Sequence, residues 1–327
     1  MKYGNATLRG KFVLGPMAAY TDIAFRLLCR KRGAAMCFTE FSNANAIIRD
    51  TSTTWSLMQT CKEELPVGIQ IFGPDAASMA QSVKMINKKV SQGELFASCI
   101  DINFGCPSGS VIRTGAGSAL LKKPEKMQEI AQACASASEI PITAKIRAGW
   151  SNDNAVPLAK LLEKAGISGI TVHWRTATEG RKRQVGWHGL HKVKEEVSIP
   201  VIANGGASTP ELAVQMLKES GCDGVMIASG ALGKPDIFQH ANALLAGKDY
   251  TPTTWEQRKE SFIEYVTLAE KHNILSAKRL RLHAIEFVSF QRGVKEVRKK
   301  LNTAKSTEEI VKIMDEFEPK PIPALQI

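Results

Sequence analysis

The sequence has no continuous apolar run that approaches the roughly 20 residues a helix needs to cross a bilayer. Its first residues also lack the apolar core of a secretory signal peptide. Low-complexity segments are absent, and the hydrophobic content of 44% is ordinary for a globular protein. We therefore expect a cytoplasmic protein with no membrane contact.

Cysteine patterns typical of disulfide frameworks or zinc sites are also missing. The seven cysteines are scattered along the chain, and none forms a CxxC pair. We expect most of them to be reduced core residues, and we expect no metal site.

Acidic residues are scarce in one stretch near the end of the chain. The formal net charge is +11. Between residues 271 and 305 there are ten basic and only two acidic side chains, so this tenth of the chain carries most of the net charge. Such an imbalance favours a polyanionic partner, with nucleic acid first among the candidates.

Short apolar runs alternate with longer amphipathic segments up to about residue 245. Eight such runs predict strands of a (β/α)8 TIM barrel. A doubly wound sheet is the alternative, but no GxGxxG motif follows the first run. The predicted strands are Phe12–Met17, Ala35–Thr39, Val67–Phe72, Cys99–Asn103, Ile142–Ile146, Gly169–Trp174, Pro200–Ala203 and Gly224–Ala228.

Helical periodicity fills most of the intervals between these strands, and it also continues after them. Residues 44–61 are rich in Thr and Ser, and residues 176–185 indicate a long loop before a short helix. After residue 247 strand signals vanish and four helices are predicted. We therefore expect a barrel domain over 1–247 and a small all-α bundle over 248–327. The predicted bundle helices are Trp255–Lys271, Leu275–Arg292, Lys295–Leu301 and Thr307–Phe317, the last capped near Thr307.

A cysteine stands in a stiff turn just past the fourth predicted strand. In Asn103-Phe104-Gly105-Cys106-Pro107, glycine permits a sharp turn and proline fixes the backbone. Cys106 could be a buried structural thiol, but this position suits a reactive group because a barrel builds its active site at the carboxyl ends of its strands.

Polar side chains stand on other strands near the same end. Lys145 lies in an apolar strand, and a buried ammonium group needs a partner, so we expect a functional role. Gln70 also needs partners in an apolar strand, because a buried amide must find hydrogen bonds. His173, taken alone, is better interpreted as a core histidine.

Glycines follow the last two predicted strands, at Gly205-Gly206 and at Gly230. In barrels this region often binds a phosphate through backbone N–H groups. A phosphorylated aromatic cofactor over the barrel mouth would use these loops and the polar groups of Gln70 and Lys145. Flavin mononucleotide (FMN) fits this description.

Eight short motifs occur in a fixed order along the barrel region. They are Gly15–Met17, Val67–Ile71, Asn103–Pro107, Gly115–Leu121, Lys145–Arg147, His173–Thr176, Asn204–Gly206 and Gly230–Gly233. With these motifs the chain resembles the tRNA-dihydrouridine synthase family. The most specific of them is Asn-x-Gly-Cys-Pro followed by Gly-Ala-Gly-Ser-Ala-Leu-Leu.

The resemblance implies a reaction. Reduced FMN would give a hydride to C6 of a uridine in tRNA, Cys106 would give a proton to C5, and NADPH would reduce the flavin again. It also implies that Asn103 and Arg147 lie near the flavin and the uracil. The FMN contacts implied by the resemblance are Pro16, Met17, Ala18, Gln70, Lys145, His173, Asn204, Gly205, Gly206, Ala228 and Ser229.

The target uridine would leave its stack to reach the flavin, while the basic helical domain would hold the tRNA backbone. We expect a monomer, because tRNA must cover a large face. Besides Asn103 and Arg147, the residues expected to bind substrate are Arg175, Lys278, Arg279, Arg281, Lys295, Arg298, Lys299 and Lys300.

Some positions depart from the family pattern. Ser229 stands where arginine is common near the FMN phosphate, Gly206 replaces a common aspartate, and Trp174 replaces a usual glycine. Residues 108–110 replace a run that is often rich in lysine. These departures indicate a divergent branch of the family.

Two other functions stay open at this point. One is an FMN-dependent barrel dehydrogenase acting on a small pyrimidine, of the dihydroorotate or dihydropyrimidine type. The other is a non-catalytic tRNA-binding protein. The basic helical segment argues against the first, and the cysteine loop argues against the second.

Overall fold

Parallel strands close into a barrel in the computed structural model, which describes residues 1–179, 187–289 and 291–320. Within these ranges eight parallel strands form the closed sheet, because β4 pairs with both β3 and β6. This confirms the predicted (β/α)8 barrel. The barrel strands are β3 (Phe12–Leu14), β4 (Cys37–Phe38), β6 (Val67–Phe72), β7 (Cys99–Asn103), β8 (Ile142–Gly149), β9 (Ile170–Thr176), β10 (Val201–Asn204) and β11 (Gly224–Ile227), and the short β5 (Ser42–Asn43) pairs with the end of β6.

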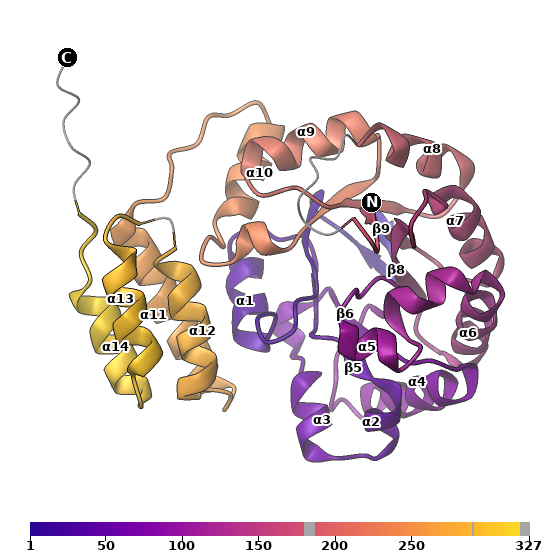
Figure 1. The fold of residues 1–327 in the computed structure, drawn as a ribbon, viewed down its shortest axis with the longest axis horizontal. Coiled ribbons are helices and arrows are strands. Elements are labelled where there is room, and N and C mark those ends of the chain that lie inside the picture. The colour runs from indigo at the N-terminus through magenta and orange to yellow at the C-terminus, as the bar shows by residue number, and fades with distance from the viewer. Residues whose placement is uncertain (180–186, 290, 321–327) are drawn as a thin grey trace.

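Helices surround this barrel (Figure 1). Their ends follow the expected chemistry: Asp75 caps α4, Thr209 caps α9, and Gly221 ends α9 with φ at 60°. The segment 44–61 forms two short helices and a 3₁₀ turn begins just after it. The surrounding helices are α1 (Ile23–Lys31), α2 (Ala44–Ile48), α3 (Ser52–Leu57), α4 (Ala76–Ser91), α5 (Gly109–Arg113), α6 (Pro124–Ala137), α7 (Ala155–Lys164), α8 (His188–Glu196), α9 (Pro210–Ser220) and α10 (Ile237–Leu245), with 3₁₀ turns η1 (Lys62–Glu64), η2 (Gly117–Lys122) and η3 (Ser229–Ala231).

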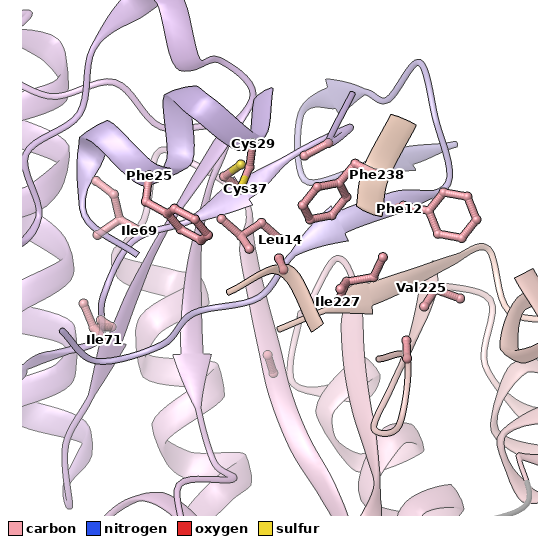
Figure 2. Close-up of a cluster of buried hydrophobic side chains, with 14 of the residues drawn as sticks. Phe12, Leu14, Phe25, Cys29, Cys37, Ile69, Ile71, Val225, Ile227 and Phe238 are labelled. Carbon is pink, nitrogen blue, oxygen red and sulfur yellow. The ribbon is translucent and has the colours of Figure 1, made fainter. Parts of the chain in front are cut away.

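The main hydrophobic core lies between the outer face of the barrel and these helices. Figure 2 shows part of it, where the strands meet α1 and α10. The side chains labelled there, all buried, are Phe12, Leu14, Phe25, Cys29, Cys37, Ile69, Ile71, Val225, Ile227 and Phe238. Such an arrangement requires strands that are apolar on their outer face as well as partly on their inner face, which explains the near-continuous apolar runs in the sequence.

A short hairpin at the N-terminal end of the chain closes the floor of the barrel. Strands β1 (Lys2–Tyr3) and β2 (Ala6–Thr7) pair antiparallel, and the fully buried Tyr3 lies within hydrogen-bond distance of Thr171, with 3.2 Å between the two hydroxyl oxygens. Tyr3 packs in a second buried cluster with Val13, Phe38 and Met226. The end of the barrel opposite the strand C-termini is therefore filled with side chains.

Among the described residues, four helices follow the barrel, and they lie together beside α1 (Figure 1). They are α11 (Trp255–Lys271), α12 (Ala277–Phe287), α13 (Val294–Thr303) and α14 (Thr307–Glu316), close to the predicted ranges. The predicted cap of α14 near Thr307 is one residue too late. The N-cap is Ser306, whose side chain accepts a hydrogen bond from the Glu309 amide. None of the helices in the described part of the chain is both long enough and apolar enough to cross a membrane.

Asp22, buried at the start of α1, is the centre of the contact between barrel and helices. Its Oδ2 accepts from the Tyr265 hydroxyl (3.1 Å) and lies 3.2 Å from Nε2 of His283 and 3.1 Å from Nη1 of Arg279. Arg279 also lies 3.5 Å from Glu40. These contacts fix the helical bundle against the β3–α1 region.

Further ion pairs and a close backbone approach surround this centre. Arg32 pairs with Asp236 and with Glu264 of α11, at 2.9 Å in each case. A Cβ atom at Gly233 would lie only 2.2 Å from the Glu286 carbonyl oxygen. Only glycine permits this approach of the η3–α10 loop to α12.

Candidate active site

Polar side chains that alternate with apolar ones along neighbouring strands meet inside the barrel. Strand register places Asn103 beside Lys145, and Arg147 beside His173, which in turn lies beside Asn204. Because side chains alternate between the two faces of a strand, every second residue points inward. The structure thus brings together the strand-end residues that the sequence singled out.

The Cys106 loop is held by the side chain of Asn103. Its Oδ1 accepts hydrogen bonds from the amides of Gly105 (3.0 Å) and Cys106 (2.8 Å). The Cys106 carbonyl accepts from the Ser118 amide (3.1 Å). The loop is therefore fixed on both sides, while Cys106 itself stays partly exposed.

Gly117 explains why the glycine-rich run follows the cysteine motif. Its φ is 59°, and a Cβ atom there would lie 2.9 Å from the Cys106 carbonyl oxygen and 2.8 Å from a methyl of Val111. A larger residue would push η2 away from the Cys106 loop.

Arg147 ties the same loop to the neighbouring strand. Its Nε donates to the Gly105 carbonyl (2.8 Å) and its Nη1 donates to the Thr176 carbonyl (3.0 Å). Burial and the nearby Arg175 lower the pKa of Arg147, which still leaves an arginine charged. The structure therefore assigns Arg147 a role in shaping the loop, beside its predicted place near substrate.

Lys145 and His173 lie together on the inner face of the barrel, where burial and neighbouring cations act on both side chains. Burial, and then Arg147, lower the pKa of Lys145 to about 8. Burial, followed by the charge of Lys145, lowers the pKa of His173 to about 2, so this imidazole is neutral. Its Nε2 is buried and has no hydrogen-bond partner among the described residues. Such groups suit a ligand that is polar and electron-rich.

Gln70 and Asn103 use their amide groups within the protein. Gln70 Nε2 donates to Asp101 (2.7 Å) and its Oε1 accepts from Asn103 Nδ2 (2.9 Å). Burial raises the pKa of Asp101 to about 6. Asp101 was missed in the sequence, although it stands two residues before Asn103 in an apolar strand and hence on the same face.

The loops after β10 and β11 pack against each other through glycines. Gly205 and Gly206 have φ of 109° and 104°, and a Cβ atom at Gly230 would lie 2.5 Å from the Ala207 carbonyl oxygen. The Gly205 carbonyl accepts from the indole N–H of Trp187 (2.9 Å), another residue that the sequence did not reveal. Of the three glycines, Gly206 is exposed, whereas Gly205 and Gly230 are buried in the region where a phosphate was predicted.

Other predicted cofactor contacts flank this region. Asn204 is buried and donates to the Met226 carbonyl (2.8 Å), whereas Ser229 is exposed and Ala228 is half-buried. In the β3–α1 loop, Pro16 and Met17 are half-buried and Ala18 is exposed. The next residue, Ala19, has φ of 68° and donates its amide to Glu40 (2.5 Å).

The basic residues predicted to bind substrate fall into two groups. Lys278, Lys295, Lys299 and Lys300 are exposed. The arginines are engaged within the protein: Arg279 with Asp22 and Glu40, Arg281 with the Ala304 carbonyl, and Arg298 with the Ser289 hydroxyl. A further predicted substrate residue, Arg175, lies half-buried on β9 close to Arg147.

The match to known proteins spans nearly the whole chain. Residues 13–320 match the family model described as dihydrouridine synthase. The chain belongs to the dihydrouridine synthase family. This membership confirms the resemblance noted in the sequence, and it defines the enzyme class as an oxidoreductase that forms dihydrouridine.

Curated dihydrouridine synthases of several bacteria are similar over most of their length. The tRNA-dihydrouridine synthase B of Vibrio vulnificus is 39% identical over 75% of each chain, and that of Shewanella oneidensis is 36% identical over 82% of each. A probable tRNA-dihydrouridine synthase of Treponema pallidum is 33% identical over 89% of this chain and 88% of its own.

Solved structures share the barrel at low sequence identity. An old yellow enzyme homologue from Zymomonas mobilis superimposes with a TM-score of 0.54 at 9% identity, covering 79% of this chain and 94% of its own. An amine oxidase from Pseudomonas geniculata that acts on 6-hydroxypseudooxynicotine gives a TM-score of 0.56 at 11% identity, over 76% of this chain and 49% of its own. These likenesses support the fold of this dihydrouridine synthase.

Proposed function

We propose that this chain reduces uridines of tRNA to 5,6-dihydrouridine, with FMN as the bound flavin, NADPH as the source of electrons and Cys106 as the acid. It would do so as a cytoplasmic monomer. The observation that carries the proposal is the Cys106 loop, which two backbone hydrogen bonds to Asn103 fix beside the inward-facing cations. Family membership and the names of the similar bacterial enzymes support the substrate.

The residues at the mouth fit a flavin. The ammonium group of Lys145 makes no hydrogen bond or ion pair among the described residues, and the buried Nε2 of His173 lacks a partner there. Both would gain one from the edge of an isoalloxazine ring, and the charges of Lys145 and Arg147 favour a ring that becomes anionic on reduction. The glycine loops after β10 and β11 would hold the phosphate, with Ser229 offering a hydroxyl.

The chain supplies the proton for the reaction. When bound, the flavin supplies the hydride that reaches C6 of the uracil. The Sγ–H bond of Cys106 breaks as the proton joins C5, and the electron pair stays on sulfur as thiolate, which takes a proton back from solvent. Asn103 and Arg147 hold the loop, so that the thiol keeps one position during this transfer.

The exposed lysines of the helical bundle would contact the tRNA backbone. Lys295, Lys299 and Lys300 lie on α13, and Lys278 lies on α12. Such contacts are electrostatic and fall off with salt. We assign Arg279, Arg281 and Arg298 to the structure of the bundle and its interface, because each already binds groups of the protein.

Reconstitution tests the proposal directly. The purified protein, supplied with FMN and NADPH, is incubated with tRNA that lacks dihydrouridine, and the nucleosides are analysed by mass spectrometry. We expect dihydrouridine in the tRNA and no reduction of free uracil or orotate. Turnover of the free pyrimidines without modification of tRNA would instead support a small-molecule dehydrogenase. A protein that binds tRNA but neither takes up FMN nor oxidises NADPH would contradict both enzymatic functions.

A further inference from the structure

A continuous series of side-chain hydrogen bonds runs from the interior of the barrel to the Cys106 loop. Thr143 donates to Oδ1 of Asp101 (2.7 Å), and Gln70 donates to its Oδ2 (2.7 Å). Asn103 donates to Gln70 (2.9 Å), and the Cys106 amide donates to Asn103 (2.8 Å). All four side chains are buried, with exposures from 0 to 8%.

The two ends of the series determine the direction of every bond in it. At the mouth, the backbone amides of Gly105 and Cys106 can only donate. At the inner end an ionised carboxylate can only accept. Each amide between them must therefore turn its oxygen toward the mouth and its nitrogen toward Asp101. An amide flipped in either position would set two donors against each other.

Burying the charged form of Asp101 at this position costs free energy. It is fully buried, and its two hydrogen-bond donors are neutral, so burial dominates and raises its pKa to about 6. A neutral side chain would serve the core of the barrel at lower cost. What the side chain at position 101 adds is a buried acceptor for the Gln70 amide.

We propose that Asp101 is a positioning residue for Cys106, acting through Gln70 and Asn103 to hold the loop in one orientation. The inference rests on the proposed role of Cys106 as the acid. It concerns a residue that touches neither the cysteine nor the mouth. Removing the acceptor at position 101 frees the Gln70 amide to flip, and the flip passes through Asn103 to the amides of the loop.

The first experiment measures the loop itself, without any catalytic turnover. Flavin-free protein carrying Cys61→Ser, which removes the other partly exposed thiol, is treated with iodoacetamide, and labelling of the Cys106 peptide is followed by mass spectrometry. Asp101→Leu should raise the labelling rate about tenfold as the loop loosens. Asp101→Asn should stay within about twofold, because its oxygen can still accept from Gln70 while its nitrogen donates to the Thr143 hydroxyl.

Thr143→Val is the matched control. It removes the other donor to the same carboxylate and leaves the series toward Cys106 intact. We expect labelling within about twofold of the parent protein. Equal increases in the labelling rate of Cys106 in Thr143→Val and Asp101→Leu would overturn the proposal. Any disturbance around the carboxylate would then be enough to loosen the Cys106 loop.

Gln70→Leu keeps the test decisive even if Asp101→Leu does not fold. This variant breaks the series one bond closer to the mouth, so labelling of Cys106 should again rise about tenfold. Where both variants fold, the double variant should label no faster than either single one, because both remove the same connection. Additive effects, or unchanged labelling in Gln70→Leu, would overturn the proposal.

Single-turnover kinetics then connects the loop to the reaction. With reduced flavin bound, Asp101→Leu should slow dihydrouridine formation about a hundredfold at saturating tRNA and leave the KM for tRNA unchanged, and Asp101→Asn should restore the rate. A loss confined to KM would overturn the proposal. If the parent protein makes no dihydrouridine, the proposed function fails, while the labelling rates still decide whether Asp101 positions the loop.

Discussion

Two buried aspartates illustrate how the environment of the same side chain differs between the barrel interior and the interface of the barrel with the helical bundle. Asp101, inside the barrel, has the neutral donors Gln70 and Thr143, and burial raises its pKa to about 6. Asp22, at the interface, is equally removed from solvent, yet His283 and Arg279 outweigh the effect of burial and lower its pKa to about 2. The charge of the partners, rather than the depth of burial, decides the direction of the shift.

The difference matches what each region does. At the interface, Arg279 and His283 of α12 offset the burial of the carboxylate, so the contact stabilises the docking of the helical bundle. Inside the barrel the charge of Lys145 does not offset the burial of the Asp101 carboxylate, which therefore costs stability, as is common for groups that prepare a site for chemistry. The following predictions test this contrast, beginning with the largest expected effect.

Cys106→Ala should affect the reaction and leave the fold intact. Loss of a general acid costs roughly a thousandfold in rate, while the cysteine is partly exposed and contributes little to the core. The measurement is dihydrouridine formed in single turnover, beside the free energy of unfolding in urea. Cys61→Ser, at the other partly exposed thiol, should keep full activity. Activity of Cys106→Ala close to that of the parent would refute the acid role.

The two aspartates should change stability with pH in opposite senses. Asp101 has a raised pKa, so its contribution to stability is present below pH 3.8 and is lost as the pH rises through 6, by about 3 kcal/mol. Asp22 has a lowered pKa, so its contribution is present above pH 3.8 and is lost as the pH falls toward 2, by about 2 kcal/mol.

Urea unfolding at several pH values measures both. The stability of the parent minus that of Asp101→Asn should fall between pH 4 and 7. The same difference for Asp22→Asn should rise between pH 2 and 5. If the two stability differences changed with pH in the same direction, the contrast between the barrel interior and the interface would be wrong.

Arg279→Met should weaken the interface. It leaves the carboxylates of Asp22 and Glu40 without their arginine, and we expect a loss of about 2 kcal/mol in unfolding free energy, allowing for partial exposure of the pair. Lys278→Met, at the exposed neighbouring position, should stay within about 0.5 kcal/mol. Equal effects of the two variants would indicate that Arg279 is an ordinary surface residue.

Charge reversal at Lys299 and Lys300 should have the smallest effect, confined to binding. We expect the affinity for tRNA to fall about tenfold and its salt dependence to become shallower, because phosphate contacts are lost. Filter binding at several salt concentrations measures this, with Lys84→Glu on α4 as the control. Unchanged affinity for tRNA would indicate that the tRNA binds elsewhere than at α13.

The sequence predicted the barrel well because its signals are local. The strands Val67–Phe72 and Cys99–Asn103 were predicted with the bounds they have in the structure. Cys106, Lys145 and His173 could be singled out because a parallel barrel gathers the ends of its strands at one mouth.

The interface could not be predicted in this way. Asp22 and His283 lie 261 positions apart in the chain, and their contact depends on how the helical bundle packs against the barrel. Arg279 was counted as a cation for tRNA because a count of charges does not reveal that two carboxylates of the barrel region face it. The role of Asp101 depends on hydrogen bonds between strands, and no single segment encodes these.

The filled floor of the barrel has a consequence for kinetics. Tyr3 and the cluster around it close the end opposite the mouth, so NADPH and the flipped uridine of the proposed reaction must reach the flavin through the same entrance. We expect that the two do not occupy it together. Initial rates measured against both substrates should therefore give parallel double-reciprocal lines, the pattern of an enzyme whose substrates take turns.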